Sequence, residues 1–181
     1  MSREKCTNKI DNRGISLVEL TVIMAIIVIL TAVVSIGLNA SSTKPALKCA
    51  QKISYSLQKA RTSSVGKVDY TFTLRVDAGN AVVSSVTEQV KPADPLRGPF
   101  DTTMASDVAV SYSADGGASY VDLPAGSAMT FKFDRSSGRI SSVEVGGAGI
   151  NLTNIRTTRN GKSYVLTIHM LTGKVDGPEA Q

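Results

Sequence analysis

Near its start the chain holds an apolar run that is too long for the core of a small soluble domain. Residues 15–38 contain one charged side chain, Glu19. As an α-helix this run would be about 36 Å long, whereas the hydrocarbon core of a bilayer is about 30 Å thick. The pattern predicts a membrane-spanning helix with one acidic side chain near its beginning.

A second helical pattern, with a narrower apolar stripe, follows this run. Apolar or small residues recur at spacings of four and three while lysines fall elsewhere: Ala46, Ala50, Ile53, Leu57, Ala60 and Ser64 against Lys44, Lys48, Lys52 and Lys59. Pro45 disfavours helix at the preceding residue, so we expect a kink or short break within residues 39–45. Residues 39–66 are predicted to continue the helix, lie on a sheet and end at Gly66. A helix with this basic face could also lie on anionic lipid.

Beyond Gly66 the period of the pattern falls to two, which is typical of strands. Apolar and polar residues alternate over 68–76, and 81–90 is predicted to be the hairpin partner. Residues 91–104, which include three prolines, are predicted to form an irregular loop. Further strands are expected at 107–113, 119–123, 128–134, 139–145, 150–157 and 163–171, with 172–175 finishing the sheet before a polar tail. The predicted fold class is α+β, a long N-terminal helix packed on an antiparallel sheet.

Charge and cysteine content add little to the prediction of function. The formal net charge of +5 over 181 residues does not by itself indicate a nucleic-acid-binding protein. Cys6 and Cys49 flank the predicted membrane segment and cannot form a structural disulfide with each other. We expect Cys49 to be a small buried residue on the helix, with an intermolecular bridge or lipidation as alternatives.

The residues around Glu19 carry a resemblance to a known family. The sequence GISLVEL at Gly14 to Leu20, followed by an apolar helix, resembles the class III signal of type IV prepilins and type II secretion pseudopilins. The resemblance implies a pilin-like fold, cleavage after Gly14, methylation of the new N-terminal Ile15, and Glu19 as the acidic fifth residue of the mature chain. It divides the chain into a leader (1–14), a transmembrane assembly helix (15–38), its amphipathic continuation (39–66) and a β-rich head (67–181). The implied partners are other pilin or pseudopilin subunits, the prepilin peptidase/N-methyltransferase, an inner-membrane assembly platform and membrane lipid.

Charge near the N-terminus agrees with that reading. The leader is short, polar and net positive, which predicts a single-pass protein of the cytoplasmic membrane with its N-terminus inside and its C-terminus outside. The protein would later become part of an extracellular or periplasmic filament.

Cleavage would leave a free amine on Ile15, one turn from the Glu19 carboxylate. Staggered copies could pair Glu19 with the neighbour's amine and so fix their register. Alternatively, Glu19 reaches headgroups or water.

A conventional secretory peptide cut near Ala40 is the rival interpretation, although its apolar core would be longer than the roughly 7 to 15 residues typical of such peptides.

The C-terminal part of the chain adds a second resemblance. Phe131-Lys132-Phe133-Asp134 leading into Ser137-Gly138-Arg139-Ile140, and later Tyr164 to Ile168 and Thr172-Gly173-Lys174-Val175, look like the paired strand-turn patterns of the H-type pseudopilin and the fimbrial-T minor pilin. This resemblance implies a low-abundance subunit near the tip of the filament. The expected function is therefore a structural subunit, a minor pilin or pseudopilin, of a type IV pilus or type II secretion-like filament.

The sequence predicts no catalytic set, metal site or cofactor, so we do not expect an enzyme. His169 is the only histidine and falls within a predicted strand. Asp115, Asp122 and Asp134 fall in predicted turns, where short acidic side chains bond their own backbone, and calcium is the alternative.

One basic group suggests an alternative function. Arg156, Arg159 and Lys162 surround the predicted Asn160-Gly161 turn, so three cations could project from a hairpin tip toward a polyanion. A filament-tip binding module for DNA uptake or adhesion would use this tip or the 91–104 loop, and its affinity for DNA would fall as the salt concentration rises. Solvated hairpin charges are the other interpretation.

Overall fold

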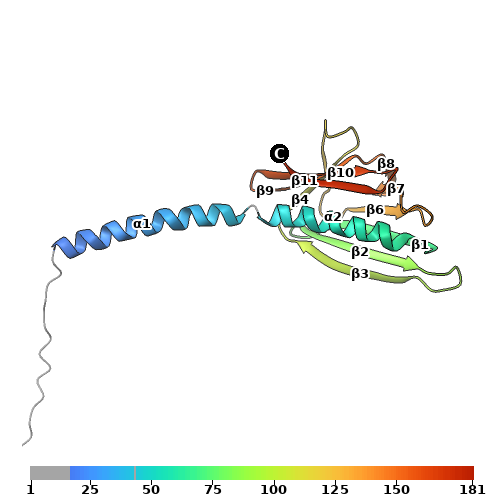
Figure 1. Ribbon diagram of the computed structural model, residues 1–181, viewed down its shortest axis with the longest axis horizontal. Coiled ribbons are helices and arrows are strands. Elements are labelled where there is room, and N and C mark those ends of the chain that lie inside the picture. Colours follow the sequence, from blue (N-terminus) through green and yellow to red (C-terminus); the bar gives the residue numbers. More distant parts are fainter. Residues whose placement is uncertain (1–16, 43) are drawn as a thin grey trace, which may run out of the picture. The chain divides into compact units, whose positions relative to one another are not determined.

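Over residues 17–42 and 44–181, which the computed structural model describes, the chain forms two helices followed by eleven strands (Figure 1). Side chains are described for residues 17–30 and 44–181. The chain divides into two structural units, Met1–Ala40 and Ser41–Gln181. The predicted leader, with Gly14, and Ile15 lie outside the described residues, as do the side chains of residues 31–38.

The helix α1, Leu17–Ser42, is apolar on all sides along its described part. The large side chains between Leu17 and Leu30 are exposed, with Leu17 at 78% of its full accessibility. The hydroxyl of Thr21 donates to the Val18 carbonyl oxygen at 2.8 Å, so it is satisfied within its own helix. Among the described residues, no helix has the length and apolarity needed for a membrane crossing.

The helix α2, Lys44–Ser64, buries the stripe that its sequence predicts. Its buried residues are Ala46, Cys49, Ala50, Ile53, Ser54, Leu57, Ala60 and Ser64, while Lys44, Lys48, Lys52 and Lys59 are exposed. Pro45 lies in the first turn, where its missing amide hydrogen costs no helical hydrogen bond. The boundary between the helices thus falls inside the stretch in which Pro45 predicts a break, and Gly66 follows the end of α2 as expected.

The strands form two antiparallel sheets where the sequence predicts one. Sheet 1 has the order β3-β2-β1-β6-β7-β8, and sheet 2 has the order β11-β10-β9-β4-β5. The strands are β1 (Asp69–Asp77), β2 (Ala81–Gln89), β3 (Arg97–Ala105), β4 (Ala109–Ser113), β5 (Val121–Asp122), β6 (Ala128–Phe133), β7 (Ile140–Val145), β8 (Ala148–Ile150), β9 (Asn154–Arg159), β10 (Lys162–His169) and β11 (Lys174–Ala180). The helix α2 contacts strands of both sheets (Figure 1). The predicted α+β class, with a helix packed on antiparallel sheet, is confirmed at that level.

The core of the head lies between α2 and the two sheets. On β1 the buried side chains alternate as predicted: Tyr70, Phe72, Leu74 and Val76. The rings of Phe72 and Phe131 have their centroids 5.7 Å apart, across the β1–β6 pair. From sheet 2, Ile155 and Leu166 are fully buried, and the Thr157 hydroxyl donates to the Ala46 carbonyl oxygen of α2 at 3.1 Å. Both sheets therefore attach to the same helix.

Two predictions at sheet edges were wrong because edge strands need no alternating pattern. Most of the predicted 91–104 loop is β3, the edge of sheet 1, where one side of the strand faces no neighbour and Pro99 is tolerated. The predicted polar tail is β11, the edge of sheet 2, so that 172–175 does not finish the sheet.

The predicted strand 150–157 was also wrong, because it is two strands in different sheets. The strand β8 ends sheet 1 at Ile150, and β9 enters sheet 2 at Asn154. Leu152, between them, is buried at 1% accessibility, and Ile150 packs against the same core. Because Leu152, which links β8 to β9, is also buried, the apolar pattern continues across the link and does not show where one strand ends and the next begins.

The two sheets meet near the C-terminal end of α2, where two turns approach closely. The Ile140 amide of β7 donates to the Met170 carbonyl oxygen, just beyond β10, at 3.1 Å. A Cβ atom on Gly173 would lie 2.6 Å from the Gly138 carbonyl oxygen, and one on Gly138 would lie 3.0 Å from the Arg61 carbonyl oxygen. The turns that carry the Ser137-Gly138 and Thr172-Gly173 patterns are therefore packed on each other and on α2.

We expect Gly173→Ala to destabilise the head more than Gly161→Ala. Both glycines have positive φ, +65° and +72°, but only the Cβ at residue 173 would meet backbone, since nothing lies within 4 Å at residue 161. Strain in the left-handed region costs about 1–3 kcal/mol and overpacking about 1–3 kcal/mol more, so the two variants should differ by at least about 1 kcal/mol. Urea denaturation of the full chain in a nonionic detergent, followed by near-ultraviolet circular dichroism of its tyrosines, measures both. Equal losses of unfolding free energy would contradict the close approach of the two turns.

Candidate functional site

The residues that the sequence singles out do not form one site. Glu19 lies on α1, in the first turn of that helix, among exposed apolar neighbours that include Val18, Leu20 and Ile23. The basic residues of the hairpin lie in the head. Glu19 is thus a carboxylate on a helix whose described surface is otherwise almost entirely apolar.

The basic hairpin is present, but two of its cations have partners within the head. Asn160-Gly161 joins β9 to β10 as predicted. The Arg159 guanidinium lies 2.9 Å from the Asp107 carboxylate and also donates to the Ser106 carbonyl oxygen at 3.3 Å. The Arg156 guanidinium carbon lies 4.0 Å from the centre of the Tyr120 ring.

These contacts determine which of the three cations remain available to bind a polyanion. Lys162 is exposed, whereas Arg156 and Arg159 are partly buried. The Nε atom of each arginine is buried and has no hydrogen-bond partner within the described part of the chain. Neither Asp107 nor Tyr120 is close to the hairpin in sequence, so sequence reasoning could not have found them. A DNA contact here stays a prediction, and in this geometry it depends mainly on Lys162.

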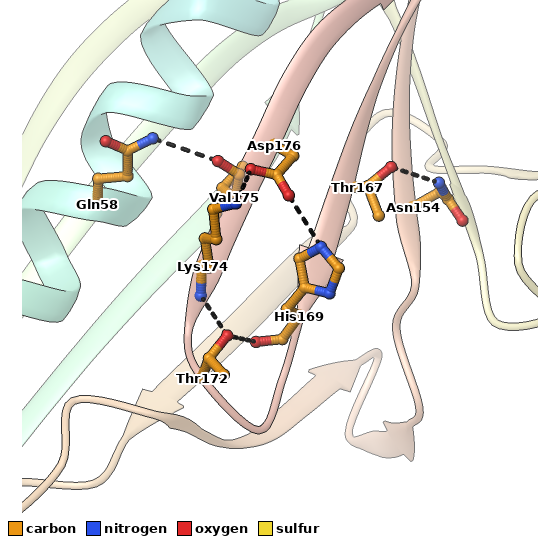
Figure 2. Close-up of polar contacts among 8 residues, drawn as sticks. All are labelled: Gln58, Asn154, Thr167, His169, Thr172, Lys174, Val175 and Asp176. Atoms are coloured by element: carbon orange, nitrogen blue, oxygen red, sulfur yellow. Dashed lines mark hydrogen bonds and ion pairs between the residues drawn. The ribbon is translucent and has the colours of Figure 1, made fainter.

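His169 ends β10, in agreement with its predicted position in a strand (Figure 2). Its Nε2 atom lies 3.0 Å from the Asp176 carboxylate, whose other oxygen lies 2.8 Å from the Lys174 ammonium. Hydrogen bonding to Lys174, followed by that to His169, lowers the pKa of Asp176. Figure 2 also shows Gln58 of α2 reaching β11, where its amide nitrogen donates to the Val175 carbonyl oxygen at 3.4 Å. His169 thus belongs to a half-exposed ion-pair group.

Asp115 bonds to its own turn, as predicted, whereas the prediction for Asp122 was wrong, since Asp122 lies in β5 and bonds a side chain of the paired strand β4. Asp115 accepts hydrogen bonds from Ser113 and Ser119, which hold its pKa well below the usual range. Asp122 accepts from the Ser111 hydroxyl at 2.8 Å. Within the described ranges, no three His, Cys, Asp or Glu residues gather closely enough to hold a metal ion.

Cys49 is fully buried on α2, which confirms the expectation of a small buried residue. Burial raises the pKa of its thiol to about 12, although Lys52 opposes the shift. A thiol in this state remains protonated at neutral pH and is a poor nucleophile.

Sequence reasoning missed a groove beside α2. The groove has a volume of about 460 Å³ and runs between α2 and the β1-β2-β3 part of sheet 1. Its helical wall consists of Lys52, Tyr55, Ser56 and Lys59, and its floor includes Phe72, Val86, Phe100 and Met104. Tyr55, a large ring outside the buried stripe of α2, is the one sequence signal that could have indicated it.

Comparisons of the chain with protein-family models, with curated proteins and with solved structures found no match.

The β6–β7 turn gives a pH prediction. The Asp134 carboxylate accepts from the Ser136 hydroxyl at 2.6 Å and the Ser136 amide at 2.8 Å, and Arg139 lies 3.2 Å away. These contacts lower the pKa of Asp134 to about 2. Because the folded-state pKa is depressed, the turn's contribution to stability is complete above the unfolded pKa of about 3.9 and disappears as pH falls through the folded value.

The variant that tests this turn is Ser136→Ala. It removes the largest cause of the shift, so the pKa of Asp134 should rise toward about 3.9 in a carboxyl-carbon NMR titration. Ser137→Ala is the matched control, since the Ser137 hydroxyl accepts from the Arg139 amide instead. An unchanged pKa of Asp134 in Ser136→Ala would refute the assigned cause.

Proposed function

We propose that this chain is a structural subunit, a minor pilin or pseudopilin, of a type IV pilus or type II secretion-like filament. It assembles through α1 after cleavage behind Gly14. The observation that supports this proposal most is α1 itself, a helix with apolar side chains exposed around its described length and one carboxylate, Glu19, in its first turn.

Such a helix is stable only where something other than water covers it. Transferring one Leu, Ile or Val side chain from water to an apolar environment is worth roughly 1.5–3 kcal/mol, and α1 exposes many of them. A bilayer supplies that environment before assembly, and neighbouring α1 helices supply it afterwards. The same apolar surface therefore serves storage in the cytoplasmic membrane and packing in a filament.

Glu19 distinguishes the two environments. A carboxylate at the centre of a bilayer costs about 2.5–3.5 kcal/mol on insertion scales, and a shallow position lowers that cost without abolishing it. In a bundle of staggered copies, the free amine of a neighbouring Ile15 could neutralise Glu19. Pairing of this kind favours one axial register over others, as buried ionic groups do in other helical assemblies.

The head is suited to being carried outside the cell on such a helix. Its fold needs no disulfide, since the Cys49 thiol is free and buried in the core. Two antiparallel sheets attach to α2, which begins two residues after α1 ends. The most direct test of the proposal is to determine which residue begins the mature wild-type chain.

We expect Gly14→Leu to leave an unprocessed precursor, because a residue larger than glycine would block the peptidase that cuts there. Asn12→Leu is the control, a similar change that keeps the residues at the cut. Mass spectrometry of the purified chains should find N-methylated Ile15 at the start of the wild type and the control only. A mature wild-type chain that begins near residue 41 would identify a secretory signal and end the proposal.

We expect Glu19→Ala to leave the amount of chain in the membrane unchanged while lowering its recovery in sheared filaments by about tenfold, equivalent to about 1.4 kcal/mol. Thr21→Ala removes a polar side chain that is already satisfied within α1, so it should assemble normally. Immunoblots of membrane and filament fractions measure both. Normal filament incorporation of Glu19→Ala would argue against the ionic pairing. It would not affect the test of cleavage after Gly14, which is independent.

A further inference from the structure

The apolar floor of the groove runs outward from the core to an open sheet edge. Phe72, Val86 and Phe100 are register partners across β1, β2 and β3. Phe72 is buried at 1% accessibility, Val86 is partly buried, and Phe100 is 58% exposed. Beside α2, sheet 1 thus presents a row of apolar side chains that becomes more exposed toward its edge strand, β3.

The helical wall of the groove is held against β3 by a specific contact. The Lys52 ammonium donates to the Met104 carbonyl oxygen at 2.8 Å. Tyr55, 67% exposed, and Lys59 follow along the same wall. The volume of about 460 Å³ lies within the range of about 300–1,000 Å³ that is typical of ligand sites.

The rim of the groove is positively charged. The sequence of α2 contains no acidic residue. Of the acids on the adjoining strands, Glu88 pairs with Lys67, and Asp77 and Asp101 pair with Arg75. Asp69 alternates with the buried Tyr70 and so lies on the other face of β1. Lys52 and Lys59 are thus left facing the groove without neutralisation by those carboxylates, and an acidic partner is favoured.

The strand beside the groove indicates what kind of acidic partner fits. Since β3 is the last strand of sheet 1, its outer backbone groups face no other strand of the described residues. Edges of this kind are commonly protected by proline or charge, but Phe100–Met104 follows Pro99 with no further proline and one charged residue, Asp101. An extended polypeptide can bond such an edge while its alternate side chains enter a pocket, whereas a lipid cannot supply the backbone bonds.

We propose that the β3 edge and the groove form a docking site for an extended segment of a partner protein. Every second residue of this segment faces the groove, and these groove-facing residues are acidic and apolar in turn. The segment adds to sheet 1 as a strand beside β3, apolar side chains cover Phe100, and carboxylates meet Lys52 and Lys59. This site lies wholly within the head, and its test does not depend on cleavage or on assembly through α1.

The test uses the full chain in a nonionic detergent and a fluorescent peptide of about six residues, the usual length of a strand. Its sequence, Glu-Thr-Val-Thr-Glu-Thr, places Glu, Val and Glu on one face. Fluorescence anisotropy should show that this peptide binds at least about tenfold more tightly than the same peptide with Lys in place of Glu. Binding should weaken by about tenfold or more in Phe100→Ala and in Lys59→Glu. The matched controls are Leu171→Ala, a large apolar residue 85% exposed elsewhere, and Lys162→Glu, an exposed lysine on sheet 2.

Backbone methylation tests the strand addition itself. Successive residues of an added strand point their amides alternately toward and away from β3. Peptides N-methylated at odd or at even positions should therefore differ, one parity losing about tenfold in affinity and the other keeping it within about threefold. Equal binding by both parities would overturn the proposal, and so would equal binding by the Lys peptide. Displacement of the acidic peptide by short-chain phosphatidylglycerol at equal concentration would identify lipid as the occupant and would also overturn it.

Discussion

The head depends on the burial of one narrow helix face between two sheets. Most of the buried residues of α2 are small, and only Ile53 and Leu57 among them are large and aliphatic. Small side chains let both sheets approach the helix closely, so Phe72 and Phe131 of sheet 1 and Leu166 of sheet 2 fill the remaining space. Because each sheet uses the same stripe as its cover, a change that displaces α2 exposes the apolar faces of both sheets together.

The contrast between the two helices follows from how much of each circumference is apolar. The described part of α1 has no polar face, so nothing in its sequence prefers one side as a contact surface. In α2 the lysines restrict contact to one stripe and thereby fix which side meets the sheets. The proposed filament subunit requires this contrast, because its head must keep one fixed packing on α2 while the whole circumference of α1 stays apolar.

Local patterns could be predicted from the sequence, and features that depend on distant pairing could not. The stripe of α2, the alternation in β1 and the turn at Asn160-Gly161 are set by neighbouring residues. The division into two sheets depends on which strands pair across long stretches of chain, such as β1 with β6 and β4 with β9. The candidate site divides in the same way: Glu19 stands out within its own segment, whereas the partners of Arg159 and Arg156 come from other parts of the fold.

The groove follows from the same geometry that stabilises the head. The helix α2 packs on two sheets at once, on β1, β2, β3 and β6 of sheet 1 and on β9, β10 and β11 of sheet 2. It does not fill all the space above sheet 1, so a groove remains between α2 and β1, β2 and β3 and ends at the exposed Phe100. Since the buried stripe excludes lysine, the positive charge of α2 is confined to the flanks of the helix, one of which is the rim of the groove. The apolar floor and the cationic rim are thus two consequences of using one helix to close two sheets, and substitutions that widened the buried stripe would remove both.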